Sequence, residues 1–143
     1  DAPSSVTRLI NIGVEPYLIS SAVNAILAQR LLRKICPHCK EEHKPSDEQR
    51  TFLTKQGFSS DTFWKGRGCD RCRKTGYAGR LGIYELLVMD DPLRDMVTQN
   101  PDVIQLRRQC RERGLVSLRE DGFAKVQAGL TTADEILRVT ESG

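Results

Sequence analysis

The sequence has no long hydrophobic run. No apolar stretch approaches the ~20 residues that span a bilayer, and the opening DAPSSVTRLI lacks the apolar core of a signal peptide. The 143 residues also contain no internal repeat and no low-complexity linker. A composition of 38% hydrophobic and 29% charged residues then indicates one globular domain, or one domain with an appended module. Because the chain opens on Asp1 within a structured-looking segment, we expect a fragment of a longer protein.

Motifs for nucleotide chemistry and catalysis are also missing from the sequence. It contains no G-x-x-x-x-G-K-[ST] phosphate loop, and no acidic residue follows a hydrophobic strand in the manner of a magnesium site. No Ser/His/Asp or Cys/His set supplies a nucleophile. The chain taken alone therefore predicts no catalytic residue and no cofactor-binding residue other than metal ligands.

Cysteine is the residue type with the clearest pattern. Four of the five cysteines form two C-x-x-C pairs, Cys36 with Cys39 and Cys69 with Cys72, and Cys110 stands alone. An odd count without a signal peptide argues against a secreted disulfide framework. A reducing compartment and a metal site fit the pattern better.

Two C-x-x-C turns can surround one Zn²⁺ ion with four thiolates at ~2.3 Å. The 29 residues between the pairs exceed the usual ribbon spacing of roughly 15–20. Loop-closure entropy grows only logarithmically with length, so a longer insert is tolerable. Four thiolates leave no position for water, and we therefore expect a structural zinc ion and not a catalytic one.

Other interpretations of the cysteines stay open. An iron–sulfur cluster also takes four cysteines, whereas a thioredoxin-like motif uses only one C-x-x-C pair. His38 and His43 lie near the first pair and are alternative ligands, although we expect them to be exposed loop residues. Cys110 is expected to be a small packed side chain between Leu106 and Leu115.

The net charge of +3 is modest, but basic residues gather in two stretches. The simpler interpretation is two solvated faces, and the alternative is contact with an acidic partner or a phosphate. The first stretch is opposed only by Asp70. The two stretches are Lys65, Arg67, Arg71, Arg73, Lys74 and Arg80, and Arg107, Arg108, Arg111 and Arg113.

Local signals predict helices in the first half of the chain. Apolar spacing predicts one over 3–12 that stops at Gly13, and Pro16 opens another that runs to Ala22. Periodicity leaves 25–35 open as helix or strand. The polar stretch that follows leads to a capping box of Ser46 with Gln49, whose helix ends at Gly57.

The second half begins irregularly and then becomes regular. We expect an irregular segment over 58–65, glycine-rich turns around the second cysteine pair, and a strand over 80–89. Three or four short helices are expected after residue 90. Their predicted N-terminal signals are Asp91-Pro92, Asn100-Pro101, Ser117 with Glu120, and Thr132 with Glu135.

Three stretches, taken in order, resemble one protein family. They are VTRLINIGVEPYLISSAVNAILAQRLLRKICPHCK, GCDRCRKTGYAGRLGIYELLVMDD and SLREDGFAKVQAGLTTADEILRVT. Together they resemble the C-terminal part of bacterial type II secretion and type IV pilus assembly ATPases over nearly the whole chain.

The resemblance implies an α/β fold that is the C-terminal portion of a RecA-like ATPase domain. Residues 1–35 would close the RecA-like nucleotide domain, with a strand at its end. Residues 36–80 would form an inserted tetracysteine zinc module. Residues 81–143 would hold a return strand and a C-terminal helical subdomain.

The resemblance also implies a function for the parent protein. It would be a cytoplasmic homo-hexameric motor at the bacterial inner membrane that hydrolyses ATP with Mg²⁺. Its partners would be the inner-membrane platform and cytoplasmic adaptor proteins of a secretion or pilus machine. The chain begins downstream of the family's phosphate loop, acidic boxes and histidine box, so we expect no ATPase activity from it alone. Arg8, Arg30 and Arg80 would face a nucleotide or a neighbouring subunit, or simply form ordinary surface salt bridges.

A free-standing zinc-ribbon module for nucleic acid or protein is the alternative function. Nucleic-acid ribbons interleave aromatic with basic residues, and only Trp64 and Tyr77 flank the basic stretch here. Both fit a core position, so no nucleic-acid partner is expected. Secretion and pilus assembly are not separated by the sequence.

Overall fold

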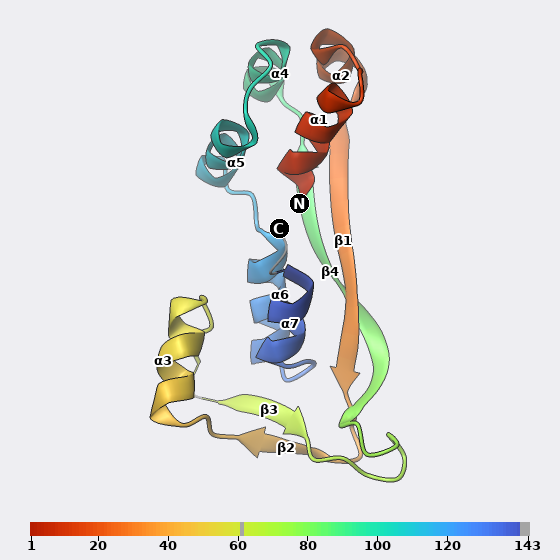
Figure 1. Ribbon diagram of the computed structural model, residues 1–143, viewed down its shortest axis with the longest axis vertical. Helices are drawn as coiled ribbons and strands as arrows, with labels where there is room; N and C mark the ends of the chain where they lie inside the picture. The colour runs from red at the N-terminus through yellow and green to blue at the C-terminus, as the bar shows by residue number, and fades with distance from the viewer. Residues whose placement is uncertain (61, 141–143) are drawn as a thin grey trace. The chain divides into compact units, whose positions relative to one another are not determined.

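The computed structural model describes residues 1–60 and 62–140 and contains both helices and strands (Figure 1). Strand β1 pairs with β4, and β2 pairs with β3 in a separate antiparallel ribbon. This content confirms a mixed α/β chain. The strands are β1 (Ala25–Ile35), β2 (Lys40–His43), β3 (Phe63–Gly66) and β4 (Tyr77–Val88). The helices are α1 (Ala2–Asn11), α2 (Pro16–Ala22), α3 (Asp47–Lys55), α4 (Asp91–Thr98), α5 (Val103–Glu112), α6 (Leu118–Gln127) and α7 (Ala133–Thr140).

The chain folds as two compact units, and the strands β1 and β4 each contribute to both. The first unit holds residues 1–29 and 84–117, and the second holds residues 30–83 and the chain from 118 onward. The predicted boundaries at residues 35 and 80 describe family modules and stay a prediction. None of the described helices is both long enough and apolar enough to cross a lipid bilayer.

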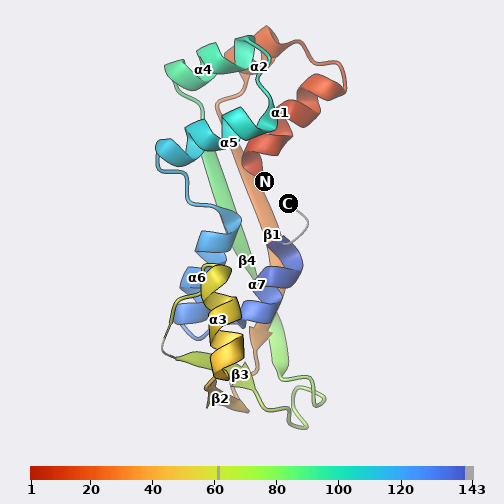
Figure 2. The ribbon, with the colours of Figure 1, turned by 60° about the vertical axis from the view of Figure 1, so that its left-hand side comes forward.

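The first unit is built on two helix pairs, α1 with α5 and α2 with α4 (Figure 2). Helix α1 begins where Asp1 accepts a hydrogen bond from the Ser4 backbone N–H at 2.9 Å, with Pro3 in its first turn. Its apolar stripe is buried. The core of this unit is formed by Ala2, Val6, Ile19, Leu87, Met89, Leu93, Val97, Leu106 and Cys110.

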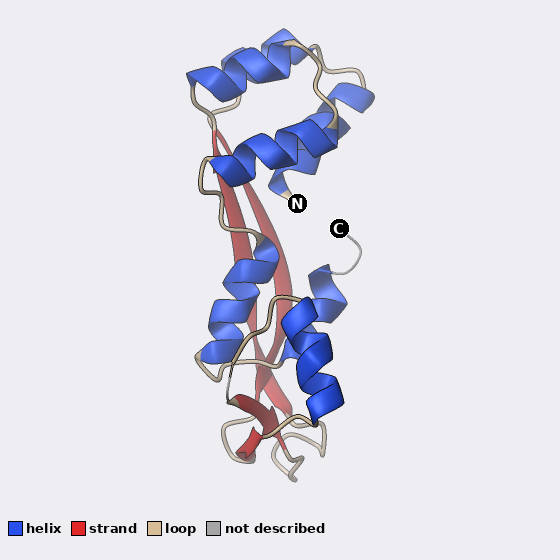
Figure 3. Cartoon of the chain, turned by 90° about the vertical axis from the view of Figure 1, so that its left-hand side faces the viewer, coloured by secondary structure: helices blue, strands red, loops and turns tan. Residues whose placement is uncertain are grey.

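The second unit packs α6 against α7, and the β2–β3 ribbon lies among long loops (Figure 3). Gly122 lets the two helices approach, because a Cβ there would lie 2.7 Å from the side chain of Ile136. The ring of Phe58, which follows α3, meets Phe123 of α6 edge-on at 5.5 Å between centroids. These contacts join the segment between the cysteine pairs to the C-terminal helices.

The structure confirms most of the predicted elements. The helices at 2–11 and 16–22 form as expected, the ambiguous segment 25–35 is a strand, and four helices follow residue 90. Two strands were not predicted. Lys40–His43 is entirely polar, and Phe63–Gly66 has two adjacent aromatic residues, so neither shows an apolar alternation. Phe63–Gly66 also falls in the segment that was expected to be irregular.

Two of the predicted N-terminal signals are wrong in detail, and the predicted cap bond of α7 is present. Helix α4 is capped by Asp90, whose carboxylate accepts from the Leu93 N–H at 3.1 Å, one residue earlier than expected. Helix α5 is capped by Asp102 and not by Asn100. At α7, Thr132 accepts from the Glu135 N–H at 3.2 Å, but the Glu135 carboxylate is engaged by arginines.

Candidate metal centre

Backbone geometry brings the two cysteine pairs together from four elements. Cys36 directly follows β1, Cys39 directly precedes β2, and the second pair lies in the turns between β3 and β4. The Cys36 N–H donates to the carbonyl of Gly76 at 2.9 Å, and the Arg67 N–H donates to the carbonyl of Cys39 at 3.0 Å. The two loops are therefore fastened to each other on both sides of the sulfur atoms.

Glycine makes this approach sterically feasible. A Cβ at Gly66 would lie 2.0 Å from the carbonyl oxygen of Gly76, a distance that no side chain tolerates. Gly76 also has φ +83°, in the left-handed region that glycine adopts most readily. The glycine density in the sequence thus serves the contact between the loops that carry the cysteines.

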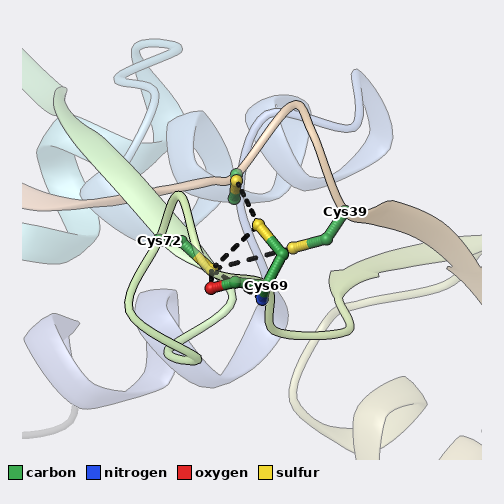
Figure 4. A group of neighbouring side chains, drawn as sticks. Cys39, Cys69 and Cys72 are labelled. Carbon is green, nitrogen blue, oxygen red and sulfur yellow. Dashed lines mark hydrogen bonds between the residues drawn. The ribbon is translucent and has the colours of Figure 1, made fainter.

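The side chains of Cys39, Cys69 and Cys72 point toward one another (Figure 4). The Sγ–Sγ distances are 3.8 Å for Cys36 to Cys69, 3.8 Å for Cys39 to Cys72, and 3.7 Å for Cys69 to Cys72. All four Sγ atoms lie within 4.8 Å of one another. Zinc–sulfur bonds of ~2.3 Å in a regular tetrahedron put the sulfurs ~3.8 Å apart, whereas a disulfide needs ~2.05 Å. The spacing fits one tetrahedral ion and not a disulfide.

Backbone N–H groups also point at the sulfurs. Cys72 Sγ accepts from the N–H groups of Cys69 and Gly76, each at 3.2 Å, and Cys39 Sγ accepts from Gly68 at 3.3 Å. Desolvation raises the pKa of Cys39 to about 11, against the lowering effect of the Gly68 N–H. Desolvation also acts to raise the pKa of Cys72, but its two N–H donors and the neighbouring thiols bring it down to about 6. Donors of this kind stabilise thiolate and favour a metal-bound state.

The predicted alternative ligands do not join the cluster. His38 is exposed and its Nε2 lies 3.2 Å from Arg71 Nη1, while His43 pairs with Phe63 in the β2–β3 ribbon. Across residues 1–60 and 62–140, the four cysteines are the sole grouping of potential metal ligands. Three of them are buried and Cys69 is half-buried.

The remaining predicted residues have other surroundings. Cys110 is buried in the first unit's core, as expected, and burial raises its pKa to about 11. The side chains of Arg8, Arg30 and Arg80 are exposed. The aromatic residues flanking the basic stretch contact cations, and these pairs are Trp64 with Lys40 at 4.7 Å and Tyr77 with Arg33 at 4.1 Å.

Sequence reasoning missed one buried cluster in the second unit. Glu135 is 2% exposed and accepts hydrogen bonds from Arg33 Nη2 at 2.7 Å and Arg138 Nη2 at 2.9 Å. Tyr77 Oη lies 2.8 Å from Thr132 Oγ1 beside it. The Thr132–Glu135 spacing predicts a capping box, and nothing local reveals a partner 102 residues away in the chain.

These features define a class of protein first: a mixed α/β chain with a closed four-cysteine centre that fits a structural metal. Residues 1–138 match the family described as Type II/IV secretion system protein. The chain belongs to this family, and the predicted resemblance is confirmed.

Similar proteins come from both kinds of machine. The chain is 42% identical over 142 residues to the type IV pilus assembly ATPase PilB of Thermus thermophilus, covering 98% of this chain and 16% of that protein. It is 41% identical over 139 residues to the type II secretion system protein E of Pseudomonas aeruginosa, covering 97% and 28%. The type II secretion system ATPase E of Vibrio cholerae is 39% identical over 140 residues, covering 98% and 28%. The chain thus spans less than a third of the length of these relatives.

Proposed function

We propose that the chain is the C-terminal part of a motor ATPase that powers type II secretion or type IV pilus assembly. The relatives named ATPases, matched over nearly all of this chain, support the proposal. The parent would act as a homo-hexamer that binds ATP and Mg²⁺ through residues outside this chain. It would work in the cytoplasm at the inner membrane, with the platform and adaptor proteins of the machine as partners.

Within that parent, residues 1–35 would end the RecA-like domain, 36–80 would form the zinc module, and 81–143 would form the return strand and helical subdomain. Strands β1 and β4, which flank the cysteine loops and pair with each other, support an insertion between two neighbouring strands. The insert would present a docking surface to a partner.

We further propose that Cys36, Cys39, Cys69 and Cys72 hold one structural Zn²⁺ ion. The Sγ–Sγ distances of 3.7–3.8 Å carry this proposal, because they match the edges of a Zn(S)₄ tetrahedron. A bound ion with four thiolates has no open position for water or substrate. It would stabilise the fold of the two loops and take no part in ATP chemistry.

Metal analysis tests the zinc proposal. Purified chain should contain about one zinc per molecule, and a Cys36→Ser/Cys69→Ser variant should contain almost none. A Cys110→Ser variant is the matched control and should keep its zinc. Equal zinc content in the double variant and the wild type would falsify the site.

ATPase assays test the motor proposal. The chain alone should show no turnover, whereas the parent, with its upstream residues restored, should hydrolyse ATP. Robust hydrolysis by these 143 residues would contradict the assignment.

A nucleic-acid role has less support, since Trp64 and Tyr77 each contact a cation of the chain. Tight DNA binding whose affinity falls steeply with salt concentration would support the nucleic-acid role instead.

A further inference from the structure

The loop between β3 and β4 carries four exposed cations next to the cysteine centre. We call Arg67, Arg71, Arg73 and Lys74 the cation face. The segments that carry it touch, because a Cβ at Gly68 would lie 3.0 Å from the Lys74 carbonyl oxygen. Their backbones are tied to ligand residues on both sides.

The ties to the metal centre are direct. The Arg67 N–H donates to the Cys39 carbonyl at 3.0 Å, and the Lys74 N–H donates to the Cys69 carbonyl at 2.8 Å. The backbone that carries these cations is therefore hydrogen-bonded to the ligand residues and does not form a loose loop. A fixed array of charges loses less entropy on binding than a mobile one.

Two neighbouring members of the face hold an unfavourable backbone conformation. Arg73 has φ +57° and Lys74 has φ +64°, both in the left-handed region. Glycine or asparagine adopts this conformation at lower cost than a long side chain. The turn itself holds this conformation, since the Arg73 N–H donates to the Asp70 carbonyl at 3.3 Å and the Lys74 N–H donates to the Cys69 carbonyl at 2.8 Å.

The charges of the face are only partly balanced. Lys74 Nζ lies 2.9 Å from Asp70 Oδ1, but these side chains are 71% and 96% exposed, so water screens the pair. Arg71 Nη1 lies 3.2 Å from Nε2 of His38 and meets no carboxylate there. Among the described residues, Arg67 and Arg73 form no ion pair with any carboxylate.

The cations are not hydrogen-bonded to the sulfurs in the described part of the chain. The hydrogen bonds to Cys39 and Cys72 from outside the cluster come from the backbone N–H groups of Gly68 and Gly76. No arginine or lysine side chain among the described residues donates to a sulfur. The cations face solvent, and the bonds that the sulfurs accept from outside the cluster come from backbone N–H groups.

We infer that the cation face is a docking surface for an acidic segment of a partner polypeptide. This inference rests on the proposed structural metal, which would hold the loop. Three of the four cations are arginines. The planar guanidinium group of arginine can donate two parallel hydrogen bonds to one carboxylate. None of the large exposed hydrophobic side chains of the described residues falls within 65–80, so the loop has no apolar group to insert into a membrane.

Peptide binding to the zinc-loaded chain tests the inference. The probe is a fluorescent poly-glutamate peptide of about 20 residues, followed by anisotropy at about 50 and 200 mM salt, where screening differs clearly. The test variant is Arg67→Ala/Arg73→Gly, in which glycine suits the left-handed backbone. The matched control is Arg108→Ala/Arg111→Ala, which removes the same charge from exposed positions of α5.

We expect the wild type and the control to bind alike, and the test variant to bind at least about tenfold more weakly with unchanged zinc content. Equal weakening in both variants, or no binding by the wild type, would overturn the inference. So would tighter binding to phosphatidylglycerol vesicles that displaces the peptide. Zinc loss in the test variant alone would assign the cations to the metal site instead. Absence of zinc from the wild type would overturn the proposed function and is measured separately.

Discussion

Glu135 shows how one buried charge fastens the C-terminal helix α7 to β1. Its carboxylate accepts from the Arg33 backbone N–H at 2.9 Å as well as from both arginine side chains. Burial acts to raise the pKa of Glu135, but the bonds from Arg33 and Arg138 outweigh it and lower the pKa to about 2 from an ordinary 4.5. A depressed pKa means that the ionised form stabilises the fold above pH ~4.5 and that this stability is lost as the pH falls toward 2.

Replacing Glu135 by glutamine should therefore lower the free energy of unfolding by about 3 kcal/mol at neutral pH. Urea unfolding followed by circular dichroism measures this loss. The difference from the wild type should shrink as the pH is lowered from 5 to about 2, because the wild-type carboxyl then protonates. Glu42→Gln, at an exposed strand position, should change stability by less than about 0.5 kcal/mol. A Glu135→Gln penalty that is independent of pH would contradict the ionic role.

Gly66 is the residue with the least room in the metal centre. A Gly66→Ala substitution would push a methyl group into the Gly76 carbonyl and separate the two loops. We expect zinc affinity, measured by competition with a chelator, to fall at least about tenfold, together with a stability loss of about 1–3 kcal/mol.

Gly57→Ala is the control for this substitution. Gly57 has φ +94° and no atom within 4 Å of an added Cβ, so alanine adds strain but no collision. It should cost about 1 kcal/mol in stability and leave zinc affinity unchanged. Equal zinc affinities in the Gly66→Ala variant and the wild type would show that the loop contact does not support the centre.

At the scale of elements, the turn between α6 and α7 is hydrogen-bonded to segments that flank the cysteine pairs. The Ile35 N–H donates to the Leu130 carbonyl at 2.9 Å, and Thr131 Oγ1 donates to the Arg33 carbonyl at 2.8 Å. A Cβ at Gly129 would lie 2.6 Å from Lys40 Nζ and 3.2 Å from Trp64 Cδ1 of the β2–β3 ribbon. The turn that joins the two C-terminal helices is thus held by residues next to the proposed metal ligands.

Removing the metal should consequently loosen the second unit. We expect faster amide hydrogen exchange at Ile35, at Cys36 and across the α6–α7 turn after chelation, because their hydrogen bonds depend on the cysteine loops. The Met89 N–H, which donates to Asn24 within the first unit, serves as the internal control and should change little. Exchange at Ile35 and Cys36 that stays as slow after chelation would contradict this coupling.

Local sequence signals predicted elements well where local physics decides them. The capping box of Ser46 with Gln49 forms as expected, with both hydrogen bonds present. The ribbon strands were missed because Lys40–His43 is polar and is stabilised by pairing with Phe63–Gly66, a partner distant in sequence. The caps of α4 and α5 fall one and two residues from the predicted ones, because Asp90 and Asp102 each accept from the N–H three residues further on.

For the whole molecule, the spacing of the cysteines was enough to predict which residues would converge. The C-x-x-C pairs brought Cys36, Cys39, Cys69 and Cys72 to within 4.8 Å of one another, and the family resemblance was confirmed. The Glu135 cluster and the left-handed pair at Arg73 and Lys74 were not predictable. The Glu135 cluster depends on a partner distant in sequence, and the left-handed pair lies in a turn whose hydrogen bonds to Cys69 and Asp70 no periodicity encodes.

The central claim is that one zinc ion holds this chain's cysteine loops through four thiolates. X-ray absorption at the zinc edge of the purified chain, with zinc quantified on the same sample, tests it most directly. We predict about one zinc per chain and a single shell of four sulfur atoms at ~2.3 Å. A shell containing nitrogen or oxygen, or a sample that binds iron in place of zinc, would contradict the account.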